Sequence, residues 1–206
     1  KAFLQFTHVK KTYDHKTLVV KDFNLDVAKG EFITLLGPSG SGKTTCLMML
    51  AGFEDVTSGE ILINGRSVTS IAPYERNIGM VFQQYALFPH MTIRENLEFV
   101  ARLYRLPHLR ETVDQTLEKL GLTNRQRQLA GALSGGWKQR LALAAVTMHN
   151  PKLLLLDEPS AGLSPVLQDE VFIQCKRINA EGIAILMVEQ NARRCLQVVD
   201  RGYVLD

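Results

Sequence analysis

The sequence lacks the patterns that indicate disulfide-rich, zinc-binding, membrane-spanning or nucleic-acid-binding proteins. Its three cysteines lie far apart and form no CxxC pair, so neither a disulfide framework nor a zinc site is indicated, and a reducing compartment is expected. No apolar run approaches the ~18 residues that a membrane-spanning helix needs, and we expect no signal peptide at the start of the chain. The net charge of +3 is too small to indicate a nucleic-acid ligand. We therefore expect a cytoplasmic protein with no nucleic-acid partner.

The composition that remains is that of one substantial globular domain, residues 1–206. Hydrophobic residues make up 46% of the chain and charged residues 22%, which is typical of domains with a real hydrophobic core. The chain starts at Lys1 without a methionine and stops at Asp206 within a strand-like run, so we expect both ends to be trimmed.

Short apolar segments alternate with helical patterns along the chain. Strands are expected at residues 3–9, 20–27, 32–36, 60–63, 77–82, 153–156, 183–188 and 202–205. Helices are expected at residues 43–50, 166–179 and 192–196, with an all-helical insertion at 90–145. This order predicts an α/β fold with a parallel sheet and an antiparallel edge sheet. Residues 1–89 and 146–206 would form the core with its β-subdomain, and 90–145 a helical subdomain.

A glycine-rich loop joins the strand at 32–36 to the helix that follows. It fits the pattern GxxxxGK[ST] with Gly37, Pro38, Ser39, Gly40, Ser41, Gly42, Lys43 and Thr44, and Thr45 comes next. Glycines let backbone N–H groups converge on phosphate oxygens, and the helix directs its positive end to the same place. Lys43 supplies charge to the phosphates and Thr44 a hydroxyl to Mg²⁺. The alternative is a chance glycine turn, but the strand before and the helix after favour a nucleotide site.

Two carboxylates end the apolar run of residues 153–156. Asp157 and Glu158 lie where a parallel strand meets the ligand crevice of an open α/β sheet. Asp157 is suited to hold Mg²⁺, and Glu158 to act as general base on the attacking water. The alternative is a solvated turn, which the presence of the phosphate loop disfavours.

A third motif, Leu133-Ser134-Gly135-Gly136, precedes Asp157 by about 20 residues. With the phosphate loop and the Asp-Glu pair, it makes the whole chain resemble the ABC ATPase family. The resemblance implies a P-loop NTPase with a RecA-like parallel core, an antiparallel β-subdomain and a helical subdomain. It also implies binding of ATP and Mg²⁺ and hydrolysis of ATP.

The resemblance assigns roles to further residues. Tyr13 matches the aromatic side chain that stacks on adenine, although it could be an ordinary edge-strand tyrosine. Gln83 matches the glutamine that senses Mg²⁺ and the attacking water, although it could be a plain polar strand end. Ser134, Gly135 and Gly136 would bind the γ-phosphate held by the opposite subunit of a head-to-tail dimer, either a homodimer or a heterodimer. An isolated Ser-Gly-Gly would more often be only a helix cap.

The family resemblance also implies partners in the membrane. The apolar segment from Tyr85 to Pro89 lies next to the groove that receives a helix of the membrane-spanning subunit in this family. The alternative is that Leu87 and Phe88 fold back into the core. If the family resemblance holds, the chain lies peripherally on the inner face of the cell membrane, and other subunits select the transported solute.

Three positions depart from the family pattern. Trp137 stands where glutamine is usual, and we expect it to pack against the helical subdomain. Gln190 stands where many members carry a catalytic histidine; an amide can bind a phosphate but cannot exchange a proton near neutral pH. Ser164 replaces an acidic residue. We therefore expect slow turnover that depends on Glu158.

Different stretches resemble different branches of the family. Residues 37–97 are similar to importers of polyamines, sugars or inorganic ions, and the end of the chain to branched-chain amino-acid importers. Residues 133–145 are similar to some drug-type exporters, so the sequence reads as a mosaic in which the first half favours import. Two other readings stay open: a non-transport ABC ATPase, and a binding module with a degenerate nucleotide site.

Overall fold

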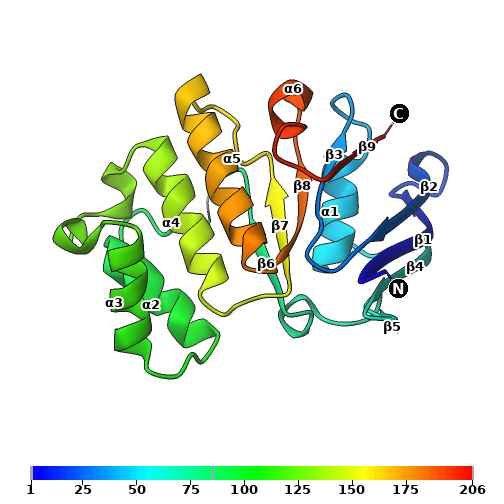
Figure 1. Ribbon diagram of the computed structural model, residues 1–206. Helices are drawn as coiled ribbons and strands as arrows, with labels where there is room; N and C mark the ends of the chain where they lie inside the picture. Colours follow the sequence, from blue (N-terminus) through cyan, green and yellow to red (C-terminus); the bar gives the residue numbers. More distant parts are fainter. Residues whose placement is uncertain (1, 85, 206) are drawn as a thin grey trace.

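The computed structural model describes residues 2–84 and 86–205 and contains a parallel sheet of five strands (Figure 1). In spatial order these strands are β6 (Ile78–Val81), β7 (Leu153–Asp157), β8 (Ala184–Val188), β3 (Phe32–Leu36) and β9 (Arg201–Val204). All four neighbouring pairs are parallel, so the carboxyl ends of the strands share one edge of the sheet. The expected α/β architecture is confirmed.

A second, antiparallel sheet is built mainly from the first part of the chain. Its spatial order is β2 (Leu18–Val27), β1 (Leu4–Thr12), β4 (Ser58–Ile63) and β5 (Arg66–Ser67). Asn64 and Gly65 both have positive φ, 52° and 73°, as a two-residue hairpin turn between β4 and β5 requires. Strand β5 is too short to be recognised from the sequence.

Helices cover both faces of the parallel sheet, which explains the unbroken leucine run of β7. Leu153 and Leu155 pack in one hydrophobic cluster with α1 (Lys43–Ala51) and the antiparallel sheet. Leu154 and Leu156 pack in a second cluster on the opposite face, with α4 (Gly135–Thr147) and α5 (Pro165–Ala180). Successive strand residues point to opposite faces, so a strand buried on both sides has no polar alternation.

The predicted helical insertion contains α2 (Ile93–Leu103), α3 (Leu109–Lys119) and most of α4, and has its own hydrophobic cluster. Thr92 caps α2 through a capping box with Glu95. Helix α4 belongs to two clusters, because Leu141 faces the insertion and Leu143 faces the parallel sheet. The division of the chain at residues 90 and 145 therefore stays a prediction. The remaining short helices are η1 (Pro73–Glu75), η2 (Thr123–Arg125), η3 (Ala130–Ala132) and α6 (Ala192–Cys195).

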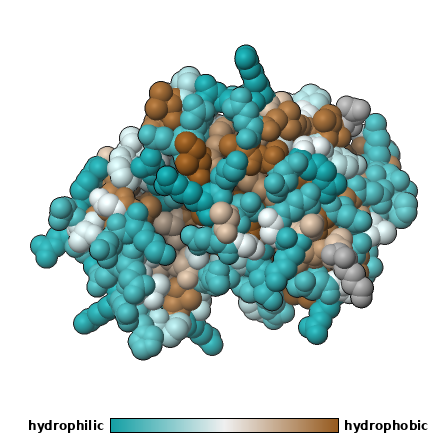
Figure 2. Space-filling view, in the orientation of Figure 1, coloured by the Kyte–Doolittle hydropathy of each residue, from teal (hydrophilic) through white to brown (hydrophobic). Residues whose placement is uncertain are grey.

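The face of the molecule shown in Figure 2 is mostly hydrophilic, with hydrophobic residues in separate patches mainly toward its upper edge. Within the described ranges, no helix is long and apolar enough to cross a membrane.

Candidate nucleotide site

The glycine-rich loop lies between β3 and α1, as the sequence predicts. Gly40 and Gly42 have φ of 85° and 87°, in the left-handed region where a side chain is strained. A Cβ atom on Gly37 would lie 2.3 Å from the carbonyl oxygen of Leu205, so only glycine fits there. The loop thus wraps tightly around the start of α1, whose first turn carries no acidic residue. A helix amino end of this kind favours an anion.

The side chain of Lys43 lies over this loop rather than in solvent. It is only 5% exposed, and its Nζ donates to the carbonyl oxygens of Gly37 (2.9 Å) and Pro38 (2.7 Å) and to the hydroxyl of Ser41 (3.3 Å). The ammonium group of Lys43 is therefore held over the loop by carbonyl and hydroxyl oxygen atoms, which carry no full negative charge. A phosphate oxygen would be a stronger partner for it.

Thr44 and Asp157 meet although they are far apart in the sequence. Thr44 Oγ1 donates a hydrogen bond of 3.2 Å to Asp157 Oδ1. Burial raises the pKa of Asp157, the neighbouring charge of Glu158 raises it further, and the Thr44 bond and Lys43 act in the opposite direction. Hydroxyl and carboxylate oxygens are the ligands that Mg²⁺ prefers, so these two residues fit the metal.

Gln83 lies near the same carboxylate. Val81 of β6 pairs with Leu156 of β7, which places Gln83 just beyond the strand edge where Asp157 lies. Both residues line a hollow of about 490 Å³, together with Phe82, Gln84, Ala86 and Leu87. The side-chain oxygen of Gln83 can add to the oxygen set of Thr44 and Asp157.

Glu158 is held in a defined position beside Gln190. Its backbone has a positive φ of 46°, uncommon for a residue with a side chain, and its N–H donates to the Val188 carbonyl at 2.9 Å. Its Oε1 accepts a hydrogen bond of 2.6 Å from Gln190 Nε2. Two of the three residues predicted to take part in hydrolysis, Glu158 and Gln190, are therefore direct neighbours.

The third motif lies apart from the phosphate loop within this chain. Helix α4 lies on the opposite face of the sheet from α1 (Figure 1). Ser134 takes the N-cap position of α4, but its hydroxyl makes no capping hydrogen bond and the residue is exposed. A Cβ atom on Gly136 would approach the Leu167 side chain to 2.9 Å. Gly136 is thus packed closely, while the exposed Ser134 hydroxyl is left without a capping bond at the start of α4.

The environments of Tyr13 and Trp137 differ. Tyr13 follows β1, is 59% exposed, and has Lys11 Nζ at 4.7 Å from its ring centroid; its contact with adenine stays a prediction. Trp137 packs against the hydrophobic cluster of the helical insertion, and the guanidinium groups of Arg125 and Arg140 lie 5.6 Å and 5.0 Å from its ring centroid. The expected packing of Trp137 is confirmed.

The predicted docking segment is partly folded inward. Leu87 packs against two hydrophobic clusters, and the ring of Phe88 lies 4.7 Å from that of Phe99. Ala86 and Pro89 are exposed, and Tyr85 lies outside the described residues. The alternative of inward folding thus holds for Leu87, while the segment keeps an exposed surface next to Gln83.

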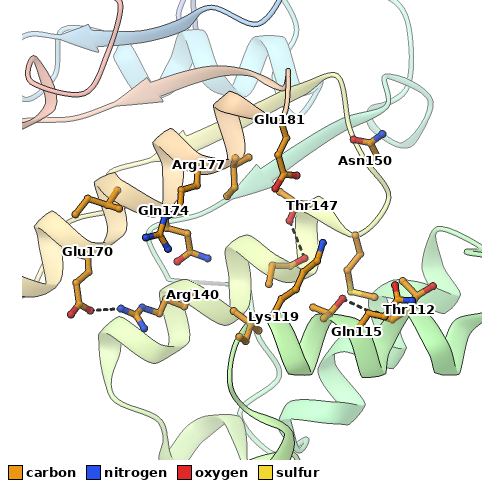
Figure 3. A pocket seen from close by; sticks show the side chains of 16 residues that line it. Thr112, Gln115, Lys119, Arg140, Thr147, Asn150, Glu170, Gln174, Arg177 and Glu181 are labelled. Carbon is orange, nitrogen blue, oxygen red and sulfur yellow. Dashed lines mark hydrogen bonds and ion pairs between the residues drawn. The ribbon is translucent and has the colours of Figure 1, made fainter.

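A larger hollow, of about 840 Å³, lies between α3, α4 and α5 (Figure 3). An Arg140–Glu170 ion pair crosses its edge. None of the residues predicted for nucleotide or Mg²⁺ binding lines it, so its volume does not mark the nucleotide site.

Glu189 is a buried carboxylate beside the Glu158–Gln190 pair, and its position there was not predicted from the sequence. It follows β8 directly, is 3% exposed, and accepts hydrogen bonds from the N–H groups of Ser160 and Gln190. The available signal was an acidic residue at the end of a fully apolar strand, the same signal that Asp157 gives.

Comparisons with known proteins agree with this geometry. A family model described as ABC transporter matches residues 20–161. The spermidine/putrescine import ATP-binding protein PotA of Haemophilus ducreyi is 40% identical over 100% of this chain, which covers 56% of that protein. PotA of Acidothermus cellulolyticus is 42% identical over 96% of this chain, which covers 53% of it. The chain thus spans about half the length of the curated relatives it matches.

Solved structures are also similar over nearly the whole chain. The cbiO1 protein of Clostridium perfringens, part of the ABC transporter complex cbiONQ, has a TM-score of 0.90 at 28% identity, covering 100% of this chain and 85% of that one. The dimeric ATP-binding cassette MJ0796, in a post-hydrolysis state bound to ADP and Pi, has a TM-score of 0.85 at 28% identity, covering 98% and 94%. The predicted fold class, a P-loop core with antiparallel and helical parts, is confirmed.

Proposed function

The chain belongs to the ABC transporter family, and we propose that it binds and hydrolyses ATP to drive solute transport through membrane-spanning partners. The observation that carries this proposal is the meeting of Thr44 and Asp157 at 3.2 Å. Their contact places the phosphate loop beside a buried carboxylate, which is the arrangement that a Mg²⁺–nucleotide needs.

ATP would be bound by the loop N–H groups, the amino end of α1 and the ammonium of Lys43. The phosphates would replace the carbonyl oxygens that Lys43 now contacts. Mg²⁺ would be held by Thr44, Asp157 and Gln83, and when bound it neutralises charge on the phosphate oxygens. The base of ATP would stack on Tyr13.

Hydrolysis would proceed by attack of water on the γ-phosphorus. Glu158 accepts the proton of the attacking water, a bond forms between the water oxygen and phosphorus, and the bond from phosphorus to the bridging oxygen of ADP breaks. Gln190 donates to Glu158, so it orients the carboxylate without taking a proton itself. Glu158 is a carboxylate partly open to solvent, which suits a group that must meet a water molecule.

The active unit would be a head-to-tail dimer. The open amino end of α4, with Ser134, Gly135 and Gly136, lies on the other face of the sheet from the phosphate loop of its own chain. Two copies related by a two-fold axis would place each α4 end against the γ-phosphate of the other copy.

Complementation between two inactive variants tests the dimer and the hydrolysis together. Lys43→Ala disables the phosphate loop, and Ser134→Arg blocks the α4 end. A mixed dimer retains one intact composite site, so an equal mixture should recover about a quarter of wild-type turnover if subunits exchange freely and sites act independently. Recovery of no activity from mixtures that do form heterodimers would contradict the shared site.

The membrane partner would dock beside the hollow lined by Gln83 and Ala86. Because Leu87 packs inward, the exposed Ala86 is the better probe. Ala86→Arg should prevent assembly with the membrane subunit while leaving nucleotide binding intact, and Ala180→Arg, at the exposed end of α5, is the matched control. Equal co-purification of both variants with the membrane subunit would refute the docking site.

The transport direction would be import, on the inner face of the cell membrane. The relatives in Haemophilus ducreyi and Acidothermus cellulolyticus are described as spermidine/putrescine import proteins, and the first half of the chain resembles such importers. The resemblance of the end of the chain to branched-chain amino-acid importers stays a prediction. Uptake of labelled polyamine by cells that depend on this chain tests the class of cargo.

A further inference from the structure

Glu189 is a buried carboxylate at the centre of the loops that follow β7 and β8. It is 3% exposed, and no salt bridge to it is formed by the residues that the structure describes. A buried charge without a cationic partner is costly unless hydrogen bonds compensate for it. Such a residue therefore calls for an explanation.

The carboxylate of Glu189 joins two loops through its two oxygen atoms. Oε1 accepts the backbone N–H of Ser160 at 2.9 Å, and Oε2 accepts the backbone N–H of Gln190 at 3.2 Å. Burial raises the pKa of Glu189, and the bonds from Ser160 and Gln190 act against that rise. The side chain thus has one acceptor for each loop.

Both loops lead directly to the Glu158–Gln190 pair. Ser160 lies two residues after Glu158, and Gln190 donates its own Nε2 to Glu158 Oε1 at 2.6 Å. A closed chain of contacts results, from Glu189 through Ser160 to Glu158, and from Glu189 through Gln190 back to Glu158. A backbone hydrogen bond of 2.9 Å from the Glu158 N–H to the Val188 carbonyl also joins the ends of β7 and β8.

We propose that Glu189 is a positioning residue for ATP hydrolysis, which holds Gln190 and the Ser160 loop so that Glu158 points at the attacking water. The proposal rests on the hydrolysis proposed above. Glu189 does not touch substrate; it acts through Gln190 and Glu158. Its effect should therefore appear in turnover and not in nucleotide affinity.

The variant Glu189→Gln tests this role with a side chain of the same shape. The amide has one oxygen acceptor, so one of the two backbone N–H groups would face an NH₂ group. Because hydrogen bonds to charged acceptors are among the stronger ones, we expect kcat to fall by about tenfold. The KM for ATP should stay within about twofold, because the side-chain hydrogen bonds of Glu189 within the described residues go to Ser160 and Gln190 and not to the phosphate loop.

Glu31→Gln is the matched control for loss of a structural carboxylate. Glu31 accepts the backbone N–H of Ala28 at 2.7 Å and pairs with Arg201 at 3.0 Å, but it precedes β3 at the opposite edge of the sheet from the site. This variant should lose thermal stability without losing kcat measured below its melting temperature. If Glu31→Gln and Glu189→Gln lower kcat equally, the positioning role is refuted.

A double-mutant cycle with Gln190→Ala separates positioning from general destabilisation. If Glu189 acts through Gln190, Glu189→Gln should lower kcat much less in the Gln190→Ala background than in the wild type. Equal effects in both backgrounds would overturn the claim that Glu189 acts through Gln190.

The same assay distinguishes the two proposals. If the wild-type protein shows no ATP turnover, or if the Glu158→Gln variant turns over ATP as fast as the wild type, the proposed hydrolysis is refuted and the positioning role with it. If the Glu158→Gln variant loses turnover and the Glu189→Gln variant keeps it, the positioning role alone is refuted.

Discussion

Replacing Glu158 by glutamine removes one charge and leaves the surrounding structure intact. The amide oxygen can still accept the hydrogen bond that Gln190 donates at 2.6 Å, and the backbone bond to Val188 is unaffected. The charge of Glu158 helps to raise the pKa of Asp157. Its removal therefore takes away one cause of the raised pKa of Asp157, so Mg²⁺ and nucleotide binding should not weaken.

The expected loss is confined to the chemical step. An amide cannot take a proton from water, and a positioned general base contributes about 10²–10⁴-fold to the rate. Glu158→Gln should thus lower kcat by about that factor, equivalent to roughly 3–5 kcal/mol in the barrier. The KM for ATP should change little, because the interaction lost is made only in the transition state.

Steady-state release of phosphate and equilibrium binding of a fluorescent ATP analogue measure the two quantities separately. Glu181→Gln is a suitable control, because Glu181 is exposed at the end of α5. A Glu158→Gln protein with kcat within about twofold of wild type would remove Glu158 from the role of general base. A loss of analogue binding equal to the loss of kcat would instead assign Glu158 to binding.

Two further predictions concern stability. Burial lowers the pKa of His149 from 6.5 to about 4, so the unfolded chain takes up a proton before the folded one as the pH falls. The free energy of unfolding should therefore decrease by about 1 kcal/mol between about pH 7.5 and 5.5. The variant His149→Phe should remove this pH dependence in denaturant titrations. A decrease of equal size in that variant would contradict the assignment. Leu155→Ala removes a fully buried side chain in β7 and should lower the free energy of unfolding by about 2–5 kcal/mol in the same measurement. A loss below about 1 kcal/mol would show that the surrounding hydrophobic cluster closes around the gap.

Local patterns were enough to predict the elements that carry the phosphate loop. The glycine spacing, the apolar run of β3 and the Lys-Thr pair that opens α1 are properties of neighbouring residues, and so is the burial of β7 on both faces. Strand β5, with two residues, has no periodicity to detect. The inward packing of Leu87 was predicted only as an alternative, because an apolar loop residue has the same sequence pattern whether it faces a partner or the core.

The sequence by itself determined the chemistry that we propose for the site: an anion-binding loop, a hydroxyl and a carboxylate suited to Mg²⁺, and a candidate general base, each predicted from residue type and spacing. Only the tertiary structure decided which of these groups meet. Strand order β6-β7-β8-β3 brings Gln83, Asp157, Gln190 and the loop to one edge, and it places the α4 end on the other face of the sheet. It also places Glu189 between two loops that are about 30 residues apart in sequence. The physical reason is that these contacts depend on strand pairing, which is a property of the whole chain and not of any segment.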